Sequence, residues 1–353
     1  MLAAPLVRFG LIGYGAWSRC HARAIQSTPG CELTAVCAAT NTSRHAAAAD
    51  TGAAVFPSLP DLLAGADVDV VDIVTPNYLH EEMACAAFAA GKHVLLEKPM
   101  ATTVAACDRI IDAAKKSACL LLVGHEMRFS GMYAEMHRLV DTGALGDVRY
   151  VLIDLWRRPY RSGSQGWRLD PARVGNWTLE EPVHFFDIAH WYLERNGEPV
   201  SIFAYGNRSE PAAPADFNTC DNFTALIRYA NGSYAALSQS LAAVEHHLSI
   251  RIFGSRACLR AEWHAEIDRS ERPAHSLEVS ENGSMRPVPV HSTPGELFEL
   301  QQEIAAMVGA VRNDAPLPMQ PEDGRRAVRL CLEARRSLET AQAGSLQPAA
   351  GSL

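Results

Sequence analysis

The chain has 353 residues, 48% of them hydrophobic and 20% charged, with a formal net charge of -8. This composition is typical of a globular protein, and the length suggests about two domains. An acidic chain without a basic tract has no general affinity for nucleic acid or for an anionic membrane surface, so we expect neither partner. No apolar run approaches the roughly 18 residues that a membrane-spanning helix needs.

The cysteines indicate the compartment. There are nine of them, an odd number, scattered along the chain without a C-x-x-C pair. This pattern predicts reduced thiols, most of them small core residues, in a cytoplasm. The N-terminus also lacks a charged region followed by an apolar segment and a cleavage site, so we expect the protein to remain in the cytoplasm.

Short apolar runs alternate with alanine-rich helical segments in the first third of the chain. We expect strands at residues 7–13, 32–38, 69–75, 93–97 and 119–124. Between them we expect helices near residues 16–28, 42–51, 79–91 and 103–117. Strands that alternate with helices in this way predict an α/β domain, residues 1–124, built on a doubly wound parallel (Rossmann) sheet.

After about residue 146 the pattern changes to alternating or β-branched segments joined by short turns, of which Asn231-Gly232 is the clearest hairpin signal. We expect strands at residues 147–155, 199–207, 221–230, 233–241, 247–254 and 257–262, and two helices near 293–313 and 321–342 that pack back on the body. These elements predict an α+β domain, residues 125–342, with a large, mostly antiparallel open sheet. Residues 343–353 are expected to form a disordered tail.

The first predicted strand leads into a glycine-rich turn, residues 13–18, which read G-Y-G-A-W-S. In a G-x-G-x-x-G turn, backbone amides and a helix N-terminus can approach a pyrophosphate, and a small third residue keeps helix and strand close. Ser18 stands here in place of the third glycine. The position of the turn after the first strand of a βαβ unit predicts dinucleotide binding, with the cofactor next to Gly13, Gly15, Ala16 and Trp17.

The end of the second strand bears on the choice between NAD and NADP. A carboxylate there binds the ribose 2′-hydroxyl of NAD, whereas residues 38–44 read A-A-T-N-T-S-R. Such residues are common in any turn that opens a helix, but they also offer donors to a 2′-phosphate. Both cofactors stay open, and the sequence favours NADP, with its phosphate held by Thr40, Asn41, Ser43 and Arg44.

In layout, residues 6 to 340 resemble the Gfo/Idh/MocA oxidoreductases, the family of glucose-fructose oxidoreductase and inositol dehydrogenase. Four segments in family order carry the resemblance: Gly13-Tyr14-Gly15, Thr75-Pro76-Asn77 with His80, Glu97-Lys98-Pro99, and the helix that bears His184.

The resemblance implies that Lys98 touches the reacting hydroxyl and the nicotinamide ribose. The residues themselves agree, because the aliphatic run 94–96 predicts a buried strand whose carboxyl end, closed by Pro99, holds Lys98 where open α/β sheets bind ligands. An ammonium there can stabilise a developing alkoxide. His80 could also be only part of the first turn of a helix. The further cofactor contacts that we predict are Thr75, Pro76, Asn77, His80 and Glu97.

Residues 175–197 predict a second catalytic element on a helix. Glu180 and His184 are four residues apart and can meet on one face. In the family, an aspartate usually precedes this histidine by four residues, and the histidine accepts or relays the substrate proton. Here Glu180 occupies that position and Glu181 follows it, so the role of the carboxylate stays open. We predict that His184 exchanges the proton and that Glu180 orients it, while Asp187 is either a site residue or a structural partner.

The segment from 156 to 168 combines arginines with aromatic residues, as a sugar site does, since aromatic faces stack on sugar rings and guanidinium groups bind hydroxyls or an anion. A solvated loop or a dimer contact would have the same composition. The predicted substrate contacts are Trp156, Arg157, Arg158, Trp167, Arg168 and Glu181, with Arg161 as a further candidate and Glu126 and Arg128 from the segment 123–131.

These features predict an NAD(P)-dependent oxidoreductase that moves a hydride between nicotinamide and a secondary hydroxyl of a sugar, sugar derivative or cyclitol, neutral or anionic. The resemblance also implies a homo-oligomer, a dimer or tetramer. One alternative is glycoside cleavage or epimerisation through a transient keto intermediate with retained cofactor, and another is a non-catalytic dinucleotide sensor that regulates a partner protein. We predict no metal site, because His246-His247 has no third ligand at a suitable spacing.

Overall fold

The computed structural model describes residues 5–159, 163–208, 220–241, 243–281, 283–313, 315–342 and 344–345. The chain divides into two compact units that are discontinuous in sequence. The first comprises Met1–Glu126, Ala172–Gly175 and Glu299–Val328, and the second Met127–Pro171, Asn176–Phe298 and Arg329–Leu353. The chain therefore crosses between the units several times, which a single boundary after residue 124 does not describe.

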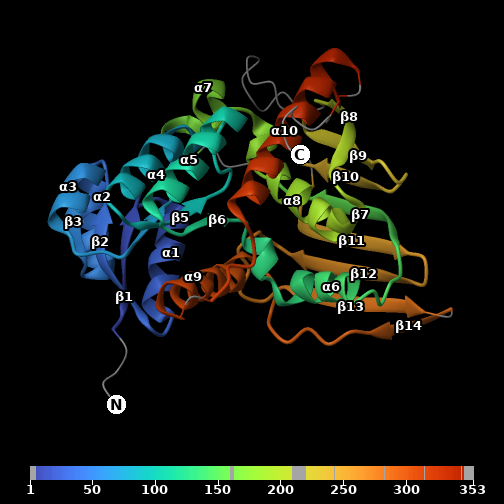
Figure 1. The fold of residues 1–353 in the computed structure, drawn as a ribbon, viewed down its shortest axis with the longest axis horizontal. Helices are drawn as coiled ribbons and strands as arrows, with labels where there is room; N and C mark the ends of the chain where they lie inside the picture. Colours follow the sequence, from blue (N-terminus) through green and yellow to red (C-terminus); the bar gives the residue numbers. More distant parts are fainter. Residues whose placement is uncertain are drawn as a thin grey trace. The chain divides into compact units, whose positions relative to one another are not determined.

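The first unit is built on a parallel sheet of six described strands in the order β3-β2-β1-β4-β5-β6 (Figure 1). Its strands are β1 (Val7–Ile12), β2 (Cys31–Cys37), β3 (Ala54–Phe56), β4 (Val70–Ile73), β5 (His93–Glu97) and β6 (Leu121–Gly124). Its helices include α1 (Ala16–Ser27), α2 (Asn41–Thr51), α3 (Leu59–Gly65), α4 (His80–Ala89) and α5 (Val104–Ser117). The predicted doubly wound sheet is confirmed, and the short elements β3 and α3 are additions to it.

The central strands of this sheet are buried on both faces. Every residue of β4 and β6 is buried, and Val94, Leu95 and Leu96 of β5 are 0% exposed. This is the pattern of a parallel sheet covered by crossover helices on both sides. An ionisable residue within such a strand needs a partner, and β4 contains one, Asp72.

The helix α9 (Glu296–Asn313) completes the first unit from residue 299 onward. Gln301 of α9 donates to the hydroxyl of Ser27 at 3.0 Å. Arg312, near the end of α9, lies so close to Gly30 that a Cβ on this glycine would be 2.3 Å from its Nη1. The start of α10 (Pro321–Thr340) lies against α5, where Arg325 binds Asp108. The two late helices were predicted, and these contacts within the first unit confirm that they pack back on the body.

The second unit holds a mostly antiparallel sheet of nine described strands in the order β14-β13-β12-β11-β7-β10-β9-β8-β15. Within it β7 and β10 pair in parallel. The strands are β7 (Val148–Trp156), β8 (Pro199–Asn207), β9 (Asn222–Tyr229), β10 (Tyr234–Ser240), β11 (His246–Gly254), β12 (Ala257–Ala265), β13 (Ala274–Glu281), β14 (Ser284–Pro287) and β15 (Gly344–Ser345). The predicted open sheet is confirmed, and β13 and β14 extend it.

Local sequence signals account for the turns and ends of this sheet. Gly232 adopts a φ of +87° between β9 and β10, where the side chain of Asn231 accepts from the backbone of Ser233, so the predicted hairpin is confirmed. At the other edge Gly344 pairs with Ile202 of β8. Part of the predicted tail is thus a short strand, and residues 346–353 lie outside the described residues.

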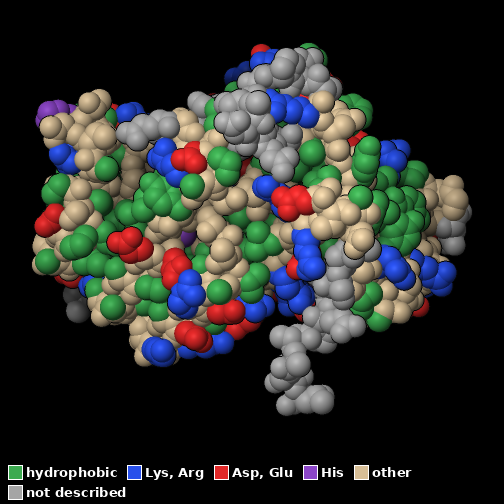
Figure 2. All heavy atoms as spheres, turned by 90° about the horizontal axis from the view of Figure 1, so that it is seen from above, with side chains coloured by type: hydrophobic (Ala, Val, Ile, Leu, Met, Phe, Trp, Pro, Cys, Tyr) green, Lys and Arg blue, Asp and Glu red, His purple; other side chains and the backbone are tan. Residues whose placement is uncertain are grey.

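The two faces of the large sheet differ. On one face α8 (Pro182–Leu193) packs against β7 and β10, and α6 (Gly131–Asp141) packs against α8. On the other face large apolar side chains are exposed, among them Phe203 (41%), Tyr205 (70%) and Leu226 (40%). Figure 2 shows hydrophobic side chains gathered in more than one place on the surface. Among the described residues no helix combines the length and hydropathy needed to cross a membrane.

Candidate active site

The sheet of the first unit brings three predicted site segments to one edge. The strands β1, β4 and β5 are neighbours and run parallel, so the residues that follow them lie along the same carboxyl edge. These residues are the glycine turn 13–18, the T-P-N turn 75–77 and the E-K-P segment 97–99. The structure thus groups the sequence motifs that were predicted to bind a dinucleotide.

The glycine turn has the geometry that its sequence predicts. Gly13 has a φ of +100°, and a Cβ there would lie 2.3 Å from the carbonyl oxygen of Val74, so only glycine fits. Gly15 caps the N-terminus of α1, and no other described atom lies within 4 Å of where its Cβ would be. The chain therefore comes close to β4 at the first glycine and leaves open space at the second.

Ser18 explains how the turn dispenses with a third glycine. Its hydroxyl accepts from the backbone of Gly15 at 3.3 Å and donates to the carbonyl of Val74 at 3.3 Å, and it is 2% exposed. The exposed start of α1 has no acidic residue in its first turn, so its amides keep their positive potential. These features fit a bound pyrophosphate at Gly15 and Ala16.

At the end of β2 the predicted 2′-phosphate residues form one polar cluster. Thr40 caps α2 by accepting from the backbone of Ser43 at 3.1 Å. The guanidinium of Arg44 donates to the carbonyls of Ala38 and Ala39 at 2.9 Å each, and also contacts Asn41. Arg44 therefore lies at the strand end where a carboxylate would select NAD.

The T-P-N turn contains an orphaned polar atom. Thr75 Oγ1 is buried and has no hydrogen-bond partner among the described residues, which fits a predicted contact with a ribose. Asn77 is 3% exposed and donates to the carbonyl of Val174 at 3.1 Å, and Pro76 precedes it as the cap of the short helix Asn77–Leu79.

His80 joins the two loops. It is 0% exposed, and its ring nitrogens lie 2.8 Å from the carbonyl oxygen of Pro99 and 3.0 Å from that of Thr75. Burial lowers the pKa of His80, which disfavours its cationic form. His80 thus lies between these two loops, and a neutral ring can donate to only one of the two carbonyl oxygens. Its cofactor contact stays a prediction.

The E-K-P segment fixes its glutamate firmly. Glu97 is 7% exposed, and its Oε1 accepts from the indole of Trp17 at 2.7 Å, while its Oε2 accepts from the backbone of Lys98 at 3.2 Å. Lys98 itself is partly exposed, and the Lys98–Pro99 peptide bond is cis. Glu97 thus anchors the segment, and Trp17, predicted beside the cofactor, contributes to that anchor.

Sequence reasoning missed a histidine that joins this anchor to the sheet. His21 of α1 is 0% exposed, with Nδ1 at 2.8 Å from Asp72 and Nε2 at 3.0 Å from Glu97. Burial would lower the pKa of His21, but the charge of Asp72 and the hydrogen bonds raise it well above the ordinary value. The available signal was Asp72, an acidic residue inside the fully buried strand β4.

In the second unit, the two carboxylates before His184 are held by arginines. Glu180 accepts from Arg168 at 2.5 Å, and Glu181, the N-cap of α8, is bound by Arg157. His184 lies in the first turn of α8, is 5% exposed and donates its backbone N–H to the carbonyl of Glu181. Orientation of His184 by Glu180 stays a prediction.

Most of the predicted substrate arginines also have protein partners. Besides Glu181, Arg157 contacts Asp268 at 3.3 Å, and Arg158 donates to the carbonyl of Val244 at 2.8 Å. These bonds leave less of each guanidinium for an anionic substrate, so that role stays a prediction. Arg161 lies outside the described residues.

The two tryptophans of this segment lie differently. Trp156 is the last residue of β7, where its indole donates to Asp154 and packs edge-on against His247, on the face of the sheet opposite α8. The sequence predicts Trp156 in a loop with the other substrate contacts, which is wrong: it ends β7, and strand alternation turns it away from the face that bears α8. Trp167 lies under the guanidinium of Arg168, at 5.1 Å.

Arg128 and Asp187 form a buried ion pair in the second unit. The two nitrogens of Arg128 reach the two carboxylate oxygens of Asp187 at 2.7 Å each, and the side chains are 3% and 2% exposed. This pair fits the structural role, and a site role for Asp187 stays open. Glu126, in the first unit, is 7% exposed at the end of β6, and substrate contacts of Glu126 and Arg128 stay predictions.

No group of three or more His, Cys, Asp or Glu side chains in the described part of the chain could hold a metal ion. His247 binds Glu262 at 2.9 Å, and His246 packs edge-on against Trp263.

A doubly wound sheet with a glycine turn after its first strand and a lysine at the end of β5 defines a dehydrogenase that binds a nicotinamide dinucleotide. Comparison with protein-family models then places the chain more narrowly. Residues 7–125 match the oxidoreductase family with an NAD-binding Rossmann fold, and residues 133–260 match the GFO/IDH/MocA C-terminal domain. The chain belongs to the Gfo/Idh/MocA oxidoreductase family, as its motifs suggested.

Individual relatives agree with this assignment. An inositol 2-dehydrogenase of Rhizobium meliloti (strain 1021) is 28% identical over 342 residues, which cover 94% of this chain and 97% of the relative. An uncharacterized oxidoreductase of Streptococcus pneumoniae is 34% identical over 259 residues, or 73% of this chain and 69% of that one. The aldose-aldose oxidoreductase of Caulobacter crescentus, solved with glycerol, has the same fold, with a TM-score of 0.82, 22% identity and coverage of 97% and 100%.

Proposed function

We propose that the protein is an NAD(P)-dependent dehydrogenase that oxidises a secondary hydroxyl of a cyclitol or sugar, or reduces the corresponding ketone. The observation that carries the proposal is the placement of Lys98 at the carboxyl edge of the sheet, with β4 alone between its strand and the strand that leads into the glycine turn. Similarity to an inositol 2-dehydrogenase along almost the whole chain supports a cyclitol as substrate.

In this proposal the bound nicotinamide supplies the hydride acceptor or donor. Lys98 donates a hydrogen bond to the reacting oxygen and stabilises negative charge on it. His184 takes up the hydroxyl proton during oxidation and returns it during reduction. Glu180 and Glu181 hold the start of α8 through their arginine partners, which keeps the backbone of His184 in place.

The cofactor that we propose is NADP in preference to NAD. The support is Arg44, whose guanidinium lies at the end of β2 in a polar cluster with Thr40, Asn41 and Ser43. A bound 2′-phosphate would replace part of its bonds to the carbonyls of Ala38 and Ala39 and to Asn41. A guanidinium suits a phosphate, and a 2′-phosphate there would meet no carboxylate from residues 38–44.

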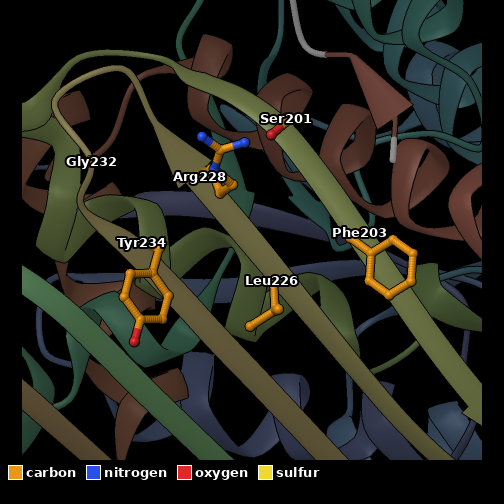
Figure 3. A pocket seen from close by; sticks show the side chains of 6 residues that line it. All are labelled: Ser201, Phe203, Leu226, Arg228, Gly232 and Tyr234. Atoms are coloured by element: carbon orange, nitrogen blue, oxygen red, sulfur yellow. The ribbon is translucent and has the colours of Figure 1, made fainter. Parts of the chain in front are cut away.

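We further propose that the protein is a homo-oligomer in which the open faces of two large sheets pair. A pocket of about 380 Å³ lies on that face (Figure 3), lined by side chains of β8, β9 and β10 and by their connecting turn: Ser201, Phe203, Leu226, Arg228, Gly232 and Tyr234. Tyr234 stacks on Tyr150 at 4.5 Å, which extends the apolar surface to β7. Exposed large apolar side chains that gather on one sheet face favour an interface, and a two-fold axis would bury those of one copy against those of the other.

The oligomer has its own test. Sedimentation velocity should show a dimer or tetramer, and Phe203→Glu should shift it towards the monomer, because a carboxylate would be buried in the apolar contact. The exposed surface variant Glu82→Gln, on α4, should leave the assembly unchanged. A monomeric wild-type protein at micromolar concentration would contradict the proposal.

We propose the cytoplasm as its compartment, because the nine cysteines, all within the described ranges, are free. Burial raises the pKa of the Cys107 thiol to about 12, so that group stays protonated and unreactive.

The deciding experiment is a panel of inositols, sugars and acidic sugars, each followed by nicotinamide absorbance with both NAD and NADP. We expect turnover of at least one cyclitol or sugar. Absence of turnover on the whole panel, with cofactor still bound, would favour a dinucleotide sensor. Product formation without net accumulation of reduced cofactor would favour cleavage or epimerisation.

A further inference from the structure

A buried charged cluster lies next to the segment that carries Lys98, all of it within the first unit. His21 and Asp72 are 0% exposed and Glu97 is 7% exposed. The three come from α1, β4 and β5, so the cluster ties a helix to two neighbouring strands at the level of the nucleotide turn. The cluster is notable for its position beside the Lys98 segment as well as for its charge.

The histidine bonds both carboxylates at once. Nδ1 is 2.8 Å from Oδ2 of Asp72 and Nε2 is 3.0 Å from Oε1 of Glu97, so an imidazolium donates to each side. A ring held at both nitrogens cannot rotate without losing a charge-assisted bond. Burial would raise the pKa of Glu97, but the bond to His21 and its charge lower it, which keeps the carboxylate ionised.

Glu97 passes this constraint to the backbone of the lysine. Its Oε1 is occupied by His21 and by the indole of Trp17, which leaves Oε2 to accept from the N–H of Lys98 at 3.2 Å. The backbone orientation of Lys98 at the end of β5 therefore depends on the orientation of the Glu97 carboxylate, which in turn depends on its bond to His21.

Stability alone does not explain the cluster. Burying an ion pair costs about as much desolvation as its attraction returns, and apolar residues of similar size are often as good. Two features suggest that the cluster serves to position Lys98. It ends at the backbone N–H of Lys98. It also leaves Oδ1 of Asp72 buried without a hydrogen-bond partner among the described residues, which costs stability.

We propose that His21 is a positioning residue for Lys98: clamped between Asp72 and Glu97, it fixes the Glu97 carboxylate, which in turn holds the backbone N–H of Lys98 and so aims the amine at the reacting oxygen. This inference rests on the proposed function of Lys98. It assigns His21 no contact with substrate or cofactor.

The kinetic test compares His21→Gln with His93→Gln, using the polyol or sugar that the wild-type protein turns over best. His93 is a matched control, because it lies at the opposite end of β5 and also bonds through its ring, to the backbone of Leu120 at 3.0 Å. We expect kcat of His21→Gln to fall about 10- to 100-fold, since a small misplacement of a reacting group costs that much, with KM changed by less than about threefold. Equal losses in both variants would overturn the proposal.

A double-mutant cycle tests the route through Glu97. If His21 acts only by fixing that carboxylate, His21→Gln combined with Glu97→Gln should lose no more kcat than the worse single variant. Losses in kcat that multiply would show two independent effects and overturn the route. Should His21→Gln fail to fold, His21→Gln with Asp72→Asn replaces it in both tests, since that pair removes one buried charge of each sign.

A third measurement does not depend on turnover. The chain has four lysines, at positions 92, 98, 115 and 116, so reductive ¹³C-methylation gives a simple NMR spectrum in which Lys98→Arg identifies the Lys98 signal. We expect the His21 variant to shift the Lys98 signal and to leave the other three lysines in place. An unmoved Lys98 signal in a folded variant would refute the positioning role. An inactive wild-type protein would instead refute the proposed function, and the NMR result would still decide about His21.

Discussion

The two units hold some of their buried carboxylates by different means. In the first, a histidine bridges Asp72 and Glu97 from a neighbouring helix. In the second, arginines bind Glu180 and Asp187. An arginine is charged at any physiological pH and binds bidentately, so its pairs are fixed, whereas a histidine can lose its proton and depends on its surroundings to keep it. The bridge of the first unit leads to the backbone of Lys98, whereas the ion pairs of the second unit hold α8 and the turn before it.

The largest effect that we predict is the loss of Lys98. Lys98→Ala should reduce kcat/KM about 10³-fold, because a donor to the developing oxyanion is removed, while cofactor affinity by fluorescence titration changes far less. Lys92→Ala, at the other end of the same strand, should keep wild-type kinetics. Activity that survives both Lys98→Ala and His184→Ala would refute the catalytic assignment.

In the second unit the corresponding effect should be on folding. Asp187→Ala should lower the free energy of unfolding by about 3–5 kcal/mol, since it removes the buried carboxylate that binds two nitrogens of the buried Arg128 guanidinium. Urea denaturation measures this. Asp141→Ala breaks an exposed pair with Arg195, with both side chains more than half exposed, and should cost less than about 1 kcal/mol. Equal losses of unfolding free energy in Asp187→Ala and Asp141→Ala would contradict the prediction that the buried pair stabilises the fold more than the exposed pair does.

Glu303 of α9 provides a pH test of the first unit. Both of its carboxylate oxygens are buried without a hydrogen-bond partner among the described residues, and its charged neighbours are Glu97, His21, Asp72 and Glu299. Burial, with Glu97 adding to it, raises the pKa of Glu303 well above the ordinary value of 4.5. The folded protein therefore binds this proton more tightly than the unfolded chain.

It follows that the contribution of Glu303 to stability is fully present below its unfolded pKa and is lost as the pH rises through its folded pKa. Glu303→Gln removes this loss. Its stability relative to wild type should therefore increase from pH 4.5 upward, by at most about 1.4 kcal/mol per pH unit. Thermal unfolding at pH 4.5, 6 and 8 measures the difference, and a difference that is constant with pH would contradict the assignment.

The smallest predicted effect concerns cofactor choice. Arg44→Ala should weaken NADP binding about tenfold, the value of one charge-assisted hydrogen bond, and leave NAD binding nearly unchanged. Arg109→Ala, which removes a surface pair with Glu81, should change neither. If NAD and NADP weaken equally, Arg44 supports the loop and does not bind the 2′-phosphate.

The sequence predicted the parts of the molecule that depend on local pattern. Buried aliphatic runs predicted the strands of the first sheet, and Asn231-Gly232 predicted a hairpin, because strand burial and turn conformation leave a periodic or a glycine signal. The motifs at the strand ends could be grouped in advance because parallel strands share one carboxyl edge.

What could not be predicted depends on contacts between distant segments. His21 lies 51 residues from Asp72 and 76 from Glu97, and nothing in the local pattern of α1 marks it as an ion-pair residue. The arginine partners of Glu180 and Glu181 also became known only from the fold. The alternating pattern predicts that the strand ends at residue 155, so Trp156 is expected in the loop that follows. The strand in fact includes Trp156, and its alternation then fixes the face of the sheet on which this side chain lies.

The discontinuity of the first unit has a consequence for how the protein is made. The segment 299–328 supplies α9, whose Leu300, Ile304 and Met307 are buried, yet the ribosome releases it only after most of the chain has been synthesised. The nucleotide-binding half therefore cannot finish folding during its own translation, and a gene truncated before residue 299 would leave apolar surface on that half uncovered.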